Sequence, residues 1–127
     1  MSNTRIERDS MGQLQVPAEA LYGAQTQRAV NNFPISNLRM PAQFVRALLL
    51  AKAAAAQANL ELEQISEAQS SAIVTACQDL LAADYMAHFP VDVFQTGSGT
   101  STNMNATKSS RPWPAGCWAK RSIRTIT

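Results

Sequence analysis

Apolar residues recur at helical spacing in the stretch that runs from Pro41 to about Leu62. Phe44 and Leu48 open this pattern, and a run of alanines continues it. A proline suits the first turn of a helix, and Ala, Leu, Gln and Lys are strong helix formers. The pattern therefore predicts a helix over residues 41–62.

A second helix is predicted directly after the first, over residues 66–88. It begins at Ser66, whose hydroxyl can accept a backbone hydrogen bond while Gln69 reaches back, which is the pattern of a capping box. Apolar residues then recur at helical spacing from Ile73, and Pro90 closes the segment. Because the alanine-rich surfaces of the two helices allow close approach, we expect the helices to pack antiparallel.

The pattern is weaker on either side of this helix pair. Residues 1–40 contain glycines, prolines and asparagines without a sustained helical period, which indicates turns, short extended pieces and one helix around residues 18–30. Residues 91–95 alternate briefly between apolar and polar types. A cluster of Gly, Ser, Thr and Asn follows at 96–105, and we predict that it is a loop.

Composition restricts the class of protein. A chain of 127 residues that is 46% hydrophobic, 16% charged and 6% aromatic is neither a disordered chain nor a collagen-like repeat. Cys77 and Cys117 are too few for a disulfide framework, so we expect reduced thiols. The longest apolar stretch, residues 47–56, contains Lys52 and is too short to cross a membrane. Because the N-terminus also lacks the apolar segment of a secretory leader, we expect a mainly α, cytoplasmic protein.

Charge is distributed unevenly along the chain. All nine acidic residues precede residue 107, whereas the segment 107–127 is rich in Lys and Arg and contains no acid. Trp113 and Trp118 also fall in this segment, and basic residues with aromatic neighbours can bind nucleic acid by phosphate contact and stacking. No nucleic-acid-binding motif accompanies them, so we expect no nucleic-acid partner.

The cluster at 96–105 is rich in hydrogen-bond donors that carry no fixed charge. Such donors suit a carboxylate or phosphate ligand, particularly where a following helix presents its N-terminus. The cluster lacks the Gly-Lys-Ser/Thr ending of a P-loop and the third glycine of a dinucleotide fingerprint, so an ordinary surface loop remains the alternative. Its donors are the backbone around Gly97 and Gly99, the hydroxyls of Ser98, Thr100 and Ser101, and the amides of Asn103 and Asn105.

His88 is the only histidine of the chain and the only side chain with an ordinary pKa near neutrality. No Ser, Cys or acidic neighbour activates it, and the following Phe89-Pro90 suggests a helix end, where a histidine commonly interacts with carbonyls. We therefore expect a structural role for His88. The aspartates nearby are expected to be charges on a solvated face and at helix ends rather than a metal site. They are Asp79, Asp84 and Asp92.

Three separate segments of the chain are distinctive when they are taken together. They are Arg-Asp-Ser-Met-Gly at 8–12 with Val16-Pro17, Leu-Tyr-Gly-Ala-Gln-Thr-Gln-Arg at 21–28, and Phe89-Pro90 leading into Gln-Thr-Gly-Ser-Gly-Thr-Ser-Thr-Asn-Met-Asn at 95–105. In order and spacing these segments resemble class II fumarase, the iron-independent fumarate hydratase, over residues 3–106. Aspartate ammonia-lyase is the near relative, but it typically has Gly-Gly-Ala-Gly-Thr where this chain has Thr-Gly-Ser-Gly-Thr, which favours fumarase.

The resemblance implies reversible addition of water to fumarate, giving L-malate, without a metal or cofactor. When a base removes a proton beside a carboxylate, charge accumulates on that carboxylate, and fixed donors around it lower the barrier. By resemblance, Ser98, Gly99 and Thr100 contact the substrate carboxylate, and Asn103 and Asn105 have supporting roles. The family forms a homotetramer with a shared bundle of long helices, and several subunits contribute to each active site.

The resemblance also indicates what the chain lacks. The segments that carry the family's acid–base histidine, its mobile Gly-Ser-Ser-x-Met-Pro-x-Lys-x-Asn loop and its bundle helices are missing, and His88 matches no catalytic position. We therefore assign no catalytic residue. Residues 1–106 are expected to be the N-terminal domain of the fumarase/aspartase-like fold, truncated before the central helical bundle and inactive alone. The alternative is a non-enzymatic module that docks on intact fumarase subunits or binds a dicarboxylate.

The segment 107–127 is related to the family by a shift of reading frame. The family continues Asn-Glu-Val-Ile-Ala, for which AAC GAA GTC ATC GCG C is a possible coding sequence. Starting one nucleotide later gives ACG AAG TCA TCG CGC, which encodes the Thr-Lys-Ser-Ser-Arg found at 107–111. Recoding the remainder in the same way yields a Leu-Leu-Gly-Lys stretch and an ending like the family's His-Pro-Asn-Asp. We therefore predict that 107–127 is an out-of-frame, disordered tail.

Overall fold

A β-hairpin occupies the N-terminal end of the computed structural model, which describes residues 3–110. Strand β1 (Thr4–Asp9) pairs antiparallel with β2 (Gly12–Pro17), and exposed positions alternate along both strands with positions that are half-buried or, at Val16, buried. The guanidinium of Arg5 fastens the hairpin to the following segment, because it donates to four backbone carbonyls at 2.6 to 2.9 Å. These carbonyls belong to Pro17, Ala18, Ala20 and Tyr22.

Helix α1 (Ala24–Asn32) lies against the hairpin. It begins later than the sequence pattern predicts, after Gly23 rather than around residue 18. Arg28 of this helix donates two hydrogen bonds, at 2.7 and 3.0 Å, to the two carboxylate oxygens of Asp9. These hydrogen bonds lower the pKa of Asp9 below its ordinary value. The ion pair thus joins α1 to the end of β1.

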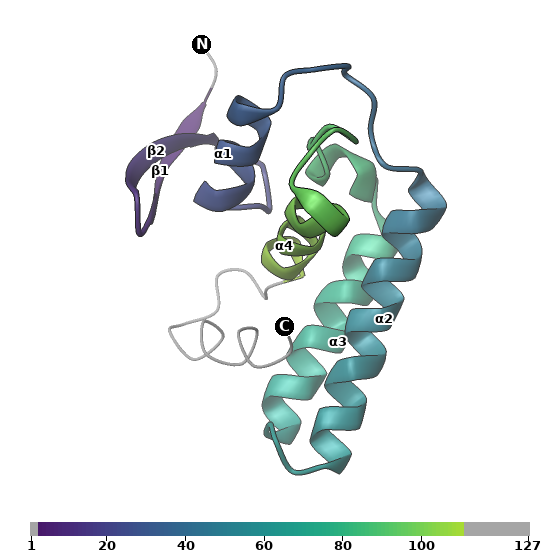
Figure 1. Cartoon of the computed structure of the whole chain (residues 1–127). Coiled ribbons are helices and arrows are strands. Elements are labelled where there is room, and N and C mark those ends of the chain that lie inside the picture. Colours follow the sequence, from purple (N-terminus) through teal and green to yellow (C-terminus); the bar gives the residue numbers. More distant parts are fainter. Residues whose placement is uncertain (1–2, 111–127) are drawn as a thin grey trace.

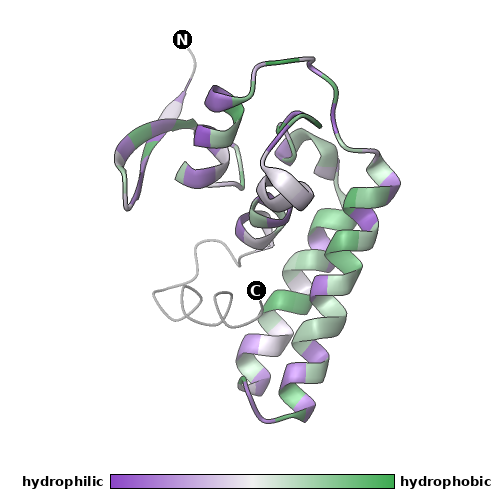
Figure 2. Cartoon of the chain, viewed as in Figure 1, coloured by the Kyte–Doolittle hydropathy of each residue, from purple (hydrophilic) through white to green (hydrophobic). Residues whose placement is uncertain are grey.

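The predicted helix pair is confirmed. Helices α2 (Ala42–Glu61) and α3 (Glu67–Ala82) run side by side and antiparallel, joined by a short turn (Figure 1). The expected capping box is present, because Ser66 Oγ accepts from the Gln69 backbone N–H and Gln69 Oε1 accepts from the Ser66 N–H. Both helices consist mostly of hydrophobic residues (Figure 2). Within residues 3–110, no helix is long and apolar enough to cross a membrane.

The second helix ends six residues before its predicted boundary at 88. Ala83 is extended, with φ −100° and ψ −175°, and a short 3₁₀ helix η1 (Tyr85–His88) follows. This break lets the chain turn back so that Phe89, 3% exposed, packs against α2. The hydroxyl of Tyr85 donates to the carbonyl of Ala42 and fixes the turn on the first residue of α2. Burial of Phe89 therefore overrides the local tendency to continue the helix.

The prediction of a loop over residues 96–105 is wrong for its second half. A short 3₁₀ turn η2 (Gly97–Gly99) leads into helix α4 (Thr100–Ser109). Ser, Thr and Asn have only moderate helix propensity, but one face of α4 is buried, and burial outweighs that preference. Helix α4 includes residues 107–109, the first three of the predicted tail. Residues 111–127 lie outside the described residues.

One apolar cluster, here called the central cluster, holds the helices together. It joins both long helices to the chain reversal before the glycine-rich segment and to α4. Because α4 contributes a fully buried alanine, the position of α4 is fixed by the same contacts that pair α2 with α3. The buried members of the central cluster are Val45, Leu49, Leu80, Phe89 and Ala106.

Cys77 belongs to a second cluster between α2 and α3, where it is completely buried. It is a free thiol, and burial raises its pKa to about 11. Cys117, the other cysteine of the chain, lies outside the described residues, so the expectation of reduced thiols stays a prediction.

Asp92 clamps two distant segments together. The expectation of a solvated position holds for Asp79 and Asp84, which are exposed, and is wrong for Asp92, which is only 3% exposed. Its carboxylate accepts from the backbone N–H and hydroxyl of Ser36 and from the backbone N–H groups of Asn37 and Phe94. Burial by itself raises the pKa of Asp92, but these hydrogen bonds lower it to about 2.

The capping box makes a measurable contribution to stability. Replacing Ser66 by alanine leaves the Gln69 N–H without its acceptor, so we expect the free energy of unfolding to fall by about 1 kcal/mol. Urea denaturation followed by circular dichroism measures this value. Ser71→Ala, at an exposed position of the same helix, is the control and is expected to change stability by less than about 0.5 kcal/mol. Equal effects of the two substitutions would contradict the assignment.

The Asp92 clamp makes stability depend on acidity. The folded pKa of about 2 lies below the ordinary value of 3.8, so the clamp stabilises the fold above about pH 4 and is lost as the pH falls towards 2. Urea midpoints measured across that range should fall less steeply for Asp92→Asn than for the unchanged chain. Asp79→Asn is the control, and it should retain the full dependence. Identical profiles for all three proteins would refute the role of the clamp.

Candidate functional site

Three of the five predicted ligand-binding residues lie together where the chain enters α4. Ser98 and Thr100 are exposed, and Gly99 between them is half-buried. Asn103 is half-buried one turn further along the helix. The site is therefore a short turn followed directly by a helix N-terminus, an arrangement that suits an anion because the first N–H groups of a helix lack partners within it.

The backbone of this turn is unusual. Ser98 (φ 61°, ψ 20°) and Gly99 (φ 67°, ψ 24°) are both left-handed, and Thr100 then returns to the right-handed helical region. Glycine adopts the left-handed region without cost, whereas a serine there is uncommon. A turn that contains such a serine keeps its shape only where surrounding contacts hold it.

Hydrogen bonds inside the turn leave the Ser98 hydroxyl available. Thr100 Oγ1 donates to the Gly97 carbonyl at 2.8 Å, and the hydroxyls of Thr96 and Ser101 lie 3.0 Å apart. The exposed Ser98 hydroxyl makes no hydrogen bond to any other residue in 3–110. It is thus a side-chain donor of the turn that is open to a ligand.

Gln95 holds the start of α4, a role that the sequence analysis did not predict. Its Oε1 accepts from the Thr102 backbone N–H at 2.8 Å, and its Nε2 donates to the Asp92 carbonyl and to Thr102 Oγ1, each also at 2.8 Å. One amide therefore bridges the two ends of the turn. No local motif signals this contact, because it depends on the path of the chain between residues 95 and 102.

Asn105 points away from the other predicted residues. It is fully buried, and its Nδ2 donates to the His88 carbonyl at 2.8 Å and to Ser109 Oγ at 3.1 Å. Positions 103 and 105 of a helix are about 200° apart around the axis, so their side chains cannot share a face. Asn105 therefore fixes α4 to η1, while Asn103 stays near the surface.

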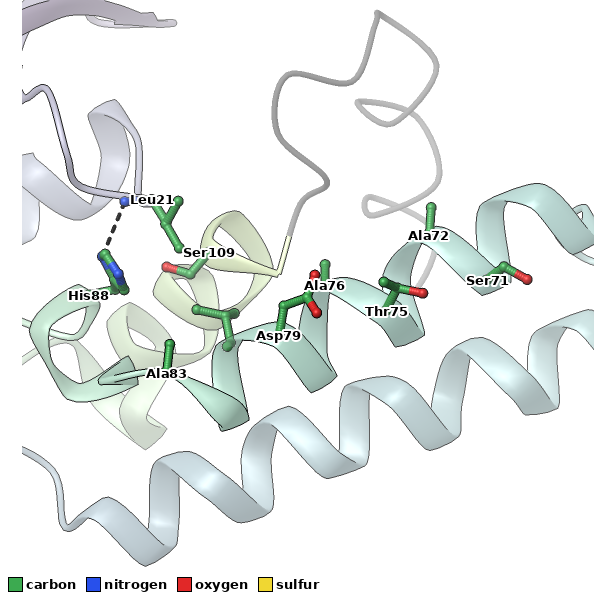
Figure 3. A pocket seen from close by; sticks show the side chains of 10 residues that line it. Leu21, Ser71, Ala72, Thr75, Ala76, Asp79, Ala83, His88 and Ser109 are labelled. Carbon is green, nitrogen blue, oxygen red and sulfur yellow. Dashed lines mark hydrogen bonds between the residues drawn. The ribbon is translucent and has the colours of Figure 1, made fainter.

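His88 lies at the end of η1, as the sequence indicates, but it bonds to an N–H rather than to carbonyls. Its Nδ1 accepts from the Leu21 backbone N–H at 3.4 Å (Figure 3). Burial lowers the pKa of His88, which favours the neutral ring that this acceptor role requires. The ring lines a groove of about 570 Å³ that runs along α3 past Ala76 and Thr75 to Ser71 (Figure 3).

The five predicted residues can form hydrogen bonds but offer no acid–base chemistry near neutral pH. None of them carries a charge or titrates near neutral pH. They can therefore hold a substrate carboxylate but cannot remove a proton from the carbon beside it. Among residues 3–110, no group of three or more His, Cys, Asp or Glu side chains is placed to hold a metal ion.

Comparison with known proteins gives consistent results. The profile of a family described as "Lyase" matches residues 12–110. "Fumarate hydratase class II 2" of Pseudomonas aeruginosa is 71% identical over 106 residues, which are 84% of this chain and 23% of that protein. "Fumarate hydratase class II" of Halobacterium salinarum is 56% identical over 102 residues, covering 80% of this chain and 22% of that protein.

Solved structures agree with this result. The class II fumarase from Schistosoma mansoni matches with a TM-score of 0.81 and 41% identity, over 85% of this chain and 23% of that one. The native "fumarate lyase:delta crystallin" from Brucella melitensis matches with a TM-score of 0.75 and 45% identity, over 85% of this chain and 26% of that one. The chain thus spans about a quarter of the length of these relatives. From the profile match and these identities, the chain belongs to the lyase family and is similar to the N-terminal part of class II fumarate hydratases.

Proposed function

We propose that this chain is the substrate-carboxylate-binding segment of a fumarate hydratase, which interconverts fumarate and L-malate. The observation that carries the proposal is the turn before α4, where the exposed Ser98 hydroxyl lies beside a helix N-terminus. A relative named fumarate hydratase is 71% identical over the region that contains this turn. Aspartate ammonia-lyase is the less favoured alternative, because the motif at 96–100 follows the fumarase pattern.

In the proposed reaction, the turn stabilises charge. Removal of a proton next to a carboxylate places a second negative charge on that carboxylate, and fixed donors stabilise it without reorganisation. We assign the contacts with the substrate carboxylate to Ser98, Gly99 and Thr100. Asn103 and Asn105 support them, Asn105 from behind through its bond to the His88 carbonyl.

The remaining chemistry belongs to protein that this sequence does not contain. The five residues hold no group that can act as the base, and His88 is occupied as an acceptor for Leu21. We therefore propose that the turn acts within a longer chain, in a cytoplasmic homotetramer whose subunits share each active site. We propose that the isolated chain is inactive, because the family's acid–base histidine and mobile loop have no counterpart in its sequence.

Activity measurements on two proteins test the proposal. The isolated chain should convert no fumarate to L-malate by NMR. A chimera should be active when residues 3–106 replace the matching segment of a full-length class II fumarate hydratase. Ser98→Ala in the chimera should lower kcat/KM at least about tenfold, because one donor to the developing charge is lost.

Ser71→Ala, at an exposed position outside the turn, is the control and should leave kcat/KM of the chimera unchanged. A folded chimera without activity, or one in which Ser98→Ala has no effect, would refute the assignment of the turn. Hydration of fumarate by the isolated chain would refute its dependence on the rest of the enzyme.

We also propose that residues 107–127 are translated from a shifted reading frame. The proposal is supported by the recoding of residues 107–111, where a shift of one nucleotide relates Asn-Glu-Val-Ile-Ala to the Thr-Lys-Ser-Ser-Arg of this chain. Sequencing of independently prepared DNA downstream of the Asn105 codon should reveal one offset that restores Asn-Glu-Val-Ile-Ala and then the mobile-loop motif of the family. A gene in which no offset restores either motif would refute this origin.

A further inference from the structure

The side chain of Gln95 connects the two ends of the turn that we assign to carboxylate binding. Its side-chain oxygen accepts from the Thr102 N–H, which is one of the N–H groups that a helix cannot satisfy internally. Its side-chain nitrogen donates to the Asp92 carbonyl on the preceding strand-like segment. The amide therefore closes the chain from residue 95 to residue 102 into a ring that contains the whole turn.

We propose that Gln95 is a positioning residue for the carboxylate-binding turn, an inference that rests on the proposed function. The turn contains Ser98 in the left-handed region, a conformation that persists only where neighbouring contacts impose it. The N-cap residue of α4 is Gly99, which has no side chain that could cap the helix. Gln95 supplies that cap from outside the helix and fixes where the helix begins.

The oxygen and the nitrogen of the Gln95 amide are both needed to hold the turn. The Thr102 N–H can only donate and the Asp92 carbonyl can only accept, so the amide fits in a single orientation. A glutamate would keep the acceptor for Thr102 but lose the donor to Asp92, and it would bring negative charge towards an anionic ligand. A methionine of similar length would lose both hydrogen bonds.

The partner of Gln95 is itself fixed. The Asp92 carboxylate accepts hydrogen bonds from Ser36, Asn37 and Phe94, so its backbone carbonyl is held in place. Gln95 thus connects the turn to a segment that is itself hydrogen-bonded to residues 36 and 37. This is why its loss should alter the turn and leave the α2–α3 pair intact.

The test uses the full 127-residue chain, labelled with ¹⁵N, and the variant Gln95→Met. Exchange of the Thr102 amide proton should become at least about tenfold faster, because its hydrogen bond is lost. The amide signals of Ser98 and Gly99 should shift, while signals of α2 and α3 stay in place. Gln78→Met, at an exposed position of α3, is the matched control and should change neither the exchange nor the turn.

Gln95→Glu is the second variant, and it separates the two hydrogen bonds. It should retain slow exchange at Thr102, because the acceptor oxygen remains. Unchanged exchange and unchanged turn signals in Gln95→Met would overturn the proposal. Loss of the α2 and α3 signals in both variants would also overturn it, because Gln95 would then support the whole fold rather than the turn.

Titration with fumarate separates this inference from the proposed function. In the unchanged chain, fumarate should shift the amide signals of Ser98, Gly99 and Thr100, and Gln95→Met should weaken that binding about tenfold. If the substitution alters the free turn but fumarate leaves the unchanged chain unaffected, the positioning role stands and the proposed function fails. If fumarate binds the unchanged chain and Gln95→Met with equal affinity, the positioning proposal fails alone.

Discussion

The packing of Phe89 and Ala106 against α2 and α3 is the contact on which the rest of the structure depends. When α2 and α3 pack together, each helix buries only one of its faces. Phe89 and Ala106 extend the apolar core between the two helices to the chain reversal at residue 89 and to α4. Because Ala106 is fully buried in this cluster, α4 can occupy only one position. The turn at its N-terminus is thereby placed at the surface, although no residue of the turn belongs to the core.

The turn itself is held from both sides by polar contacts. On one side, Gln95 bonds to Thr102 and to the carbonyl of Asp92. On the other, Asn105 ties α4 to the carbonyl of His88. These hydrogen bonds on both sides allow the short surface turn to keep Ser98 in the left-handed region. In the proposed function, this rigidity is what makes neutral donors effective towards a developing negative charge.

The residues of this chain fit one part of a larger site. The turn offers hydrogen-bond donors and no group that titrates near neutral pH. The chain spans about a quarter of the length of its relatives. Exposed apolar side chains such as Phe44 and Leu50 on α2 fit a fragment of this kind, since single domains bury most such surface against other elements. In the proposed function, this segment therefore supplies carboxylate binding, and the rest of a longer enzyme supplies proton transfer.

The sequence by itself determined the features that depend on neighbouring residues. The helix over 41–62, the capping box at Ser66 and the position of the donor-rich cluster all follow from local spacing and propensity. Only the tertiary structure decided that half of this cluster is helical, that Asn105 faces inward and that Asp92 is buried. Those outcomes depend on partners far away in the chain, such as Ser36 for Asp92, 56 residues apart. Local patterns cannot specify such partners, because burial and hydrogen bonding between distant segments exist only once the chain has folded.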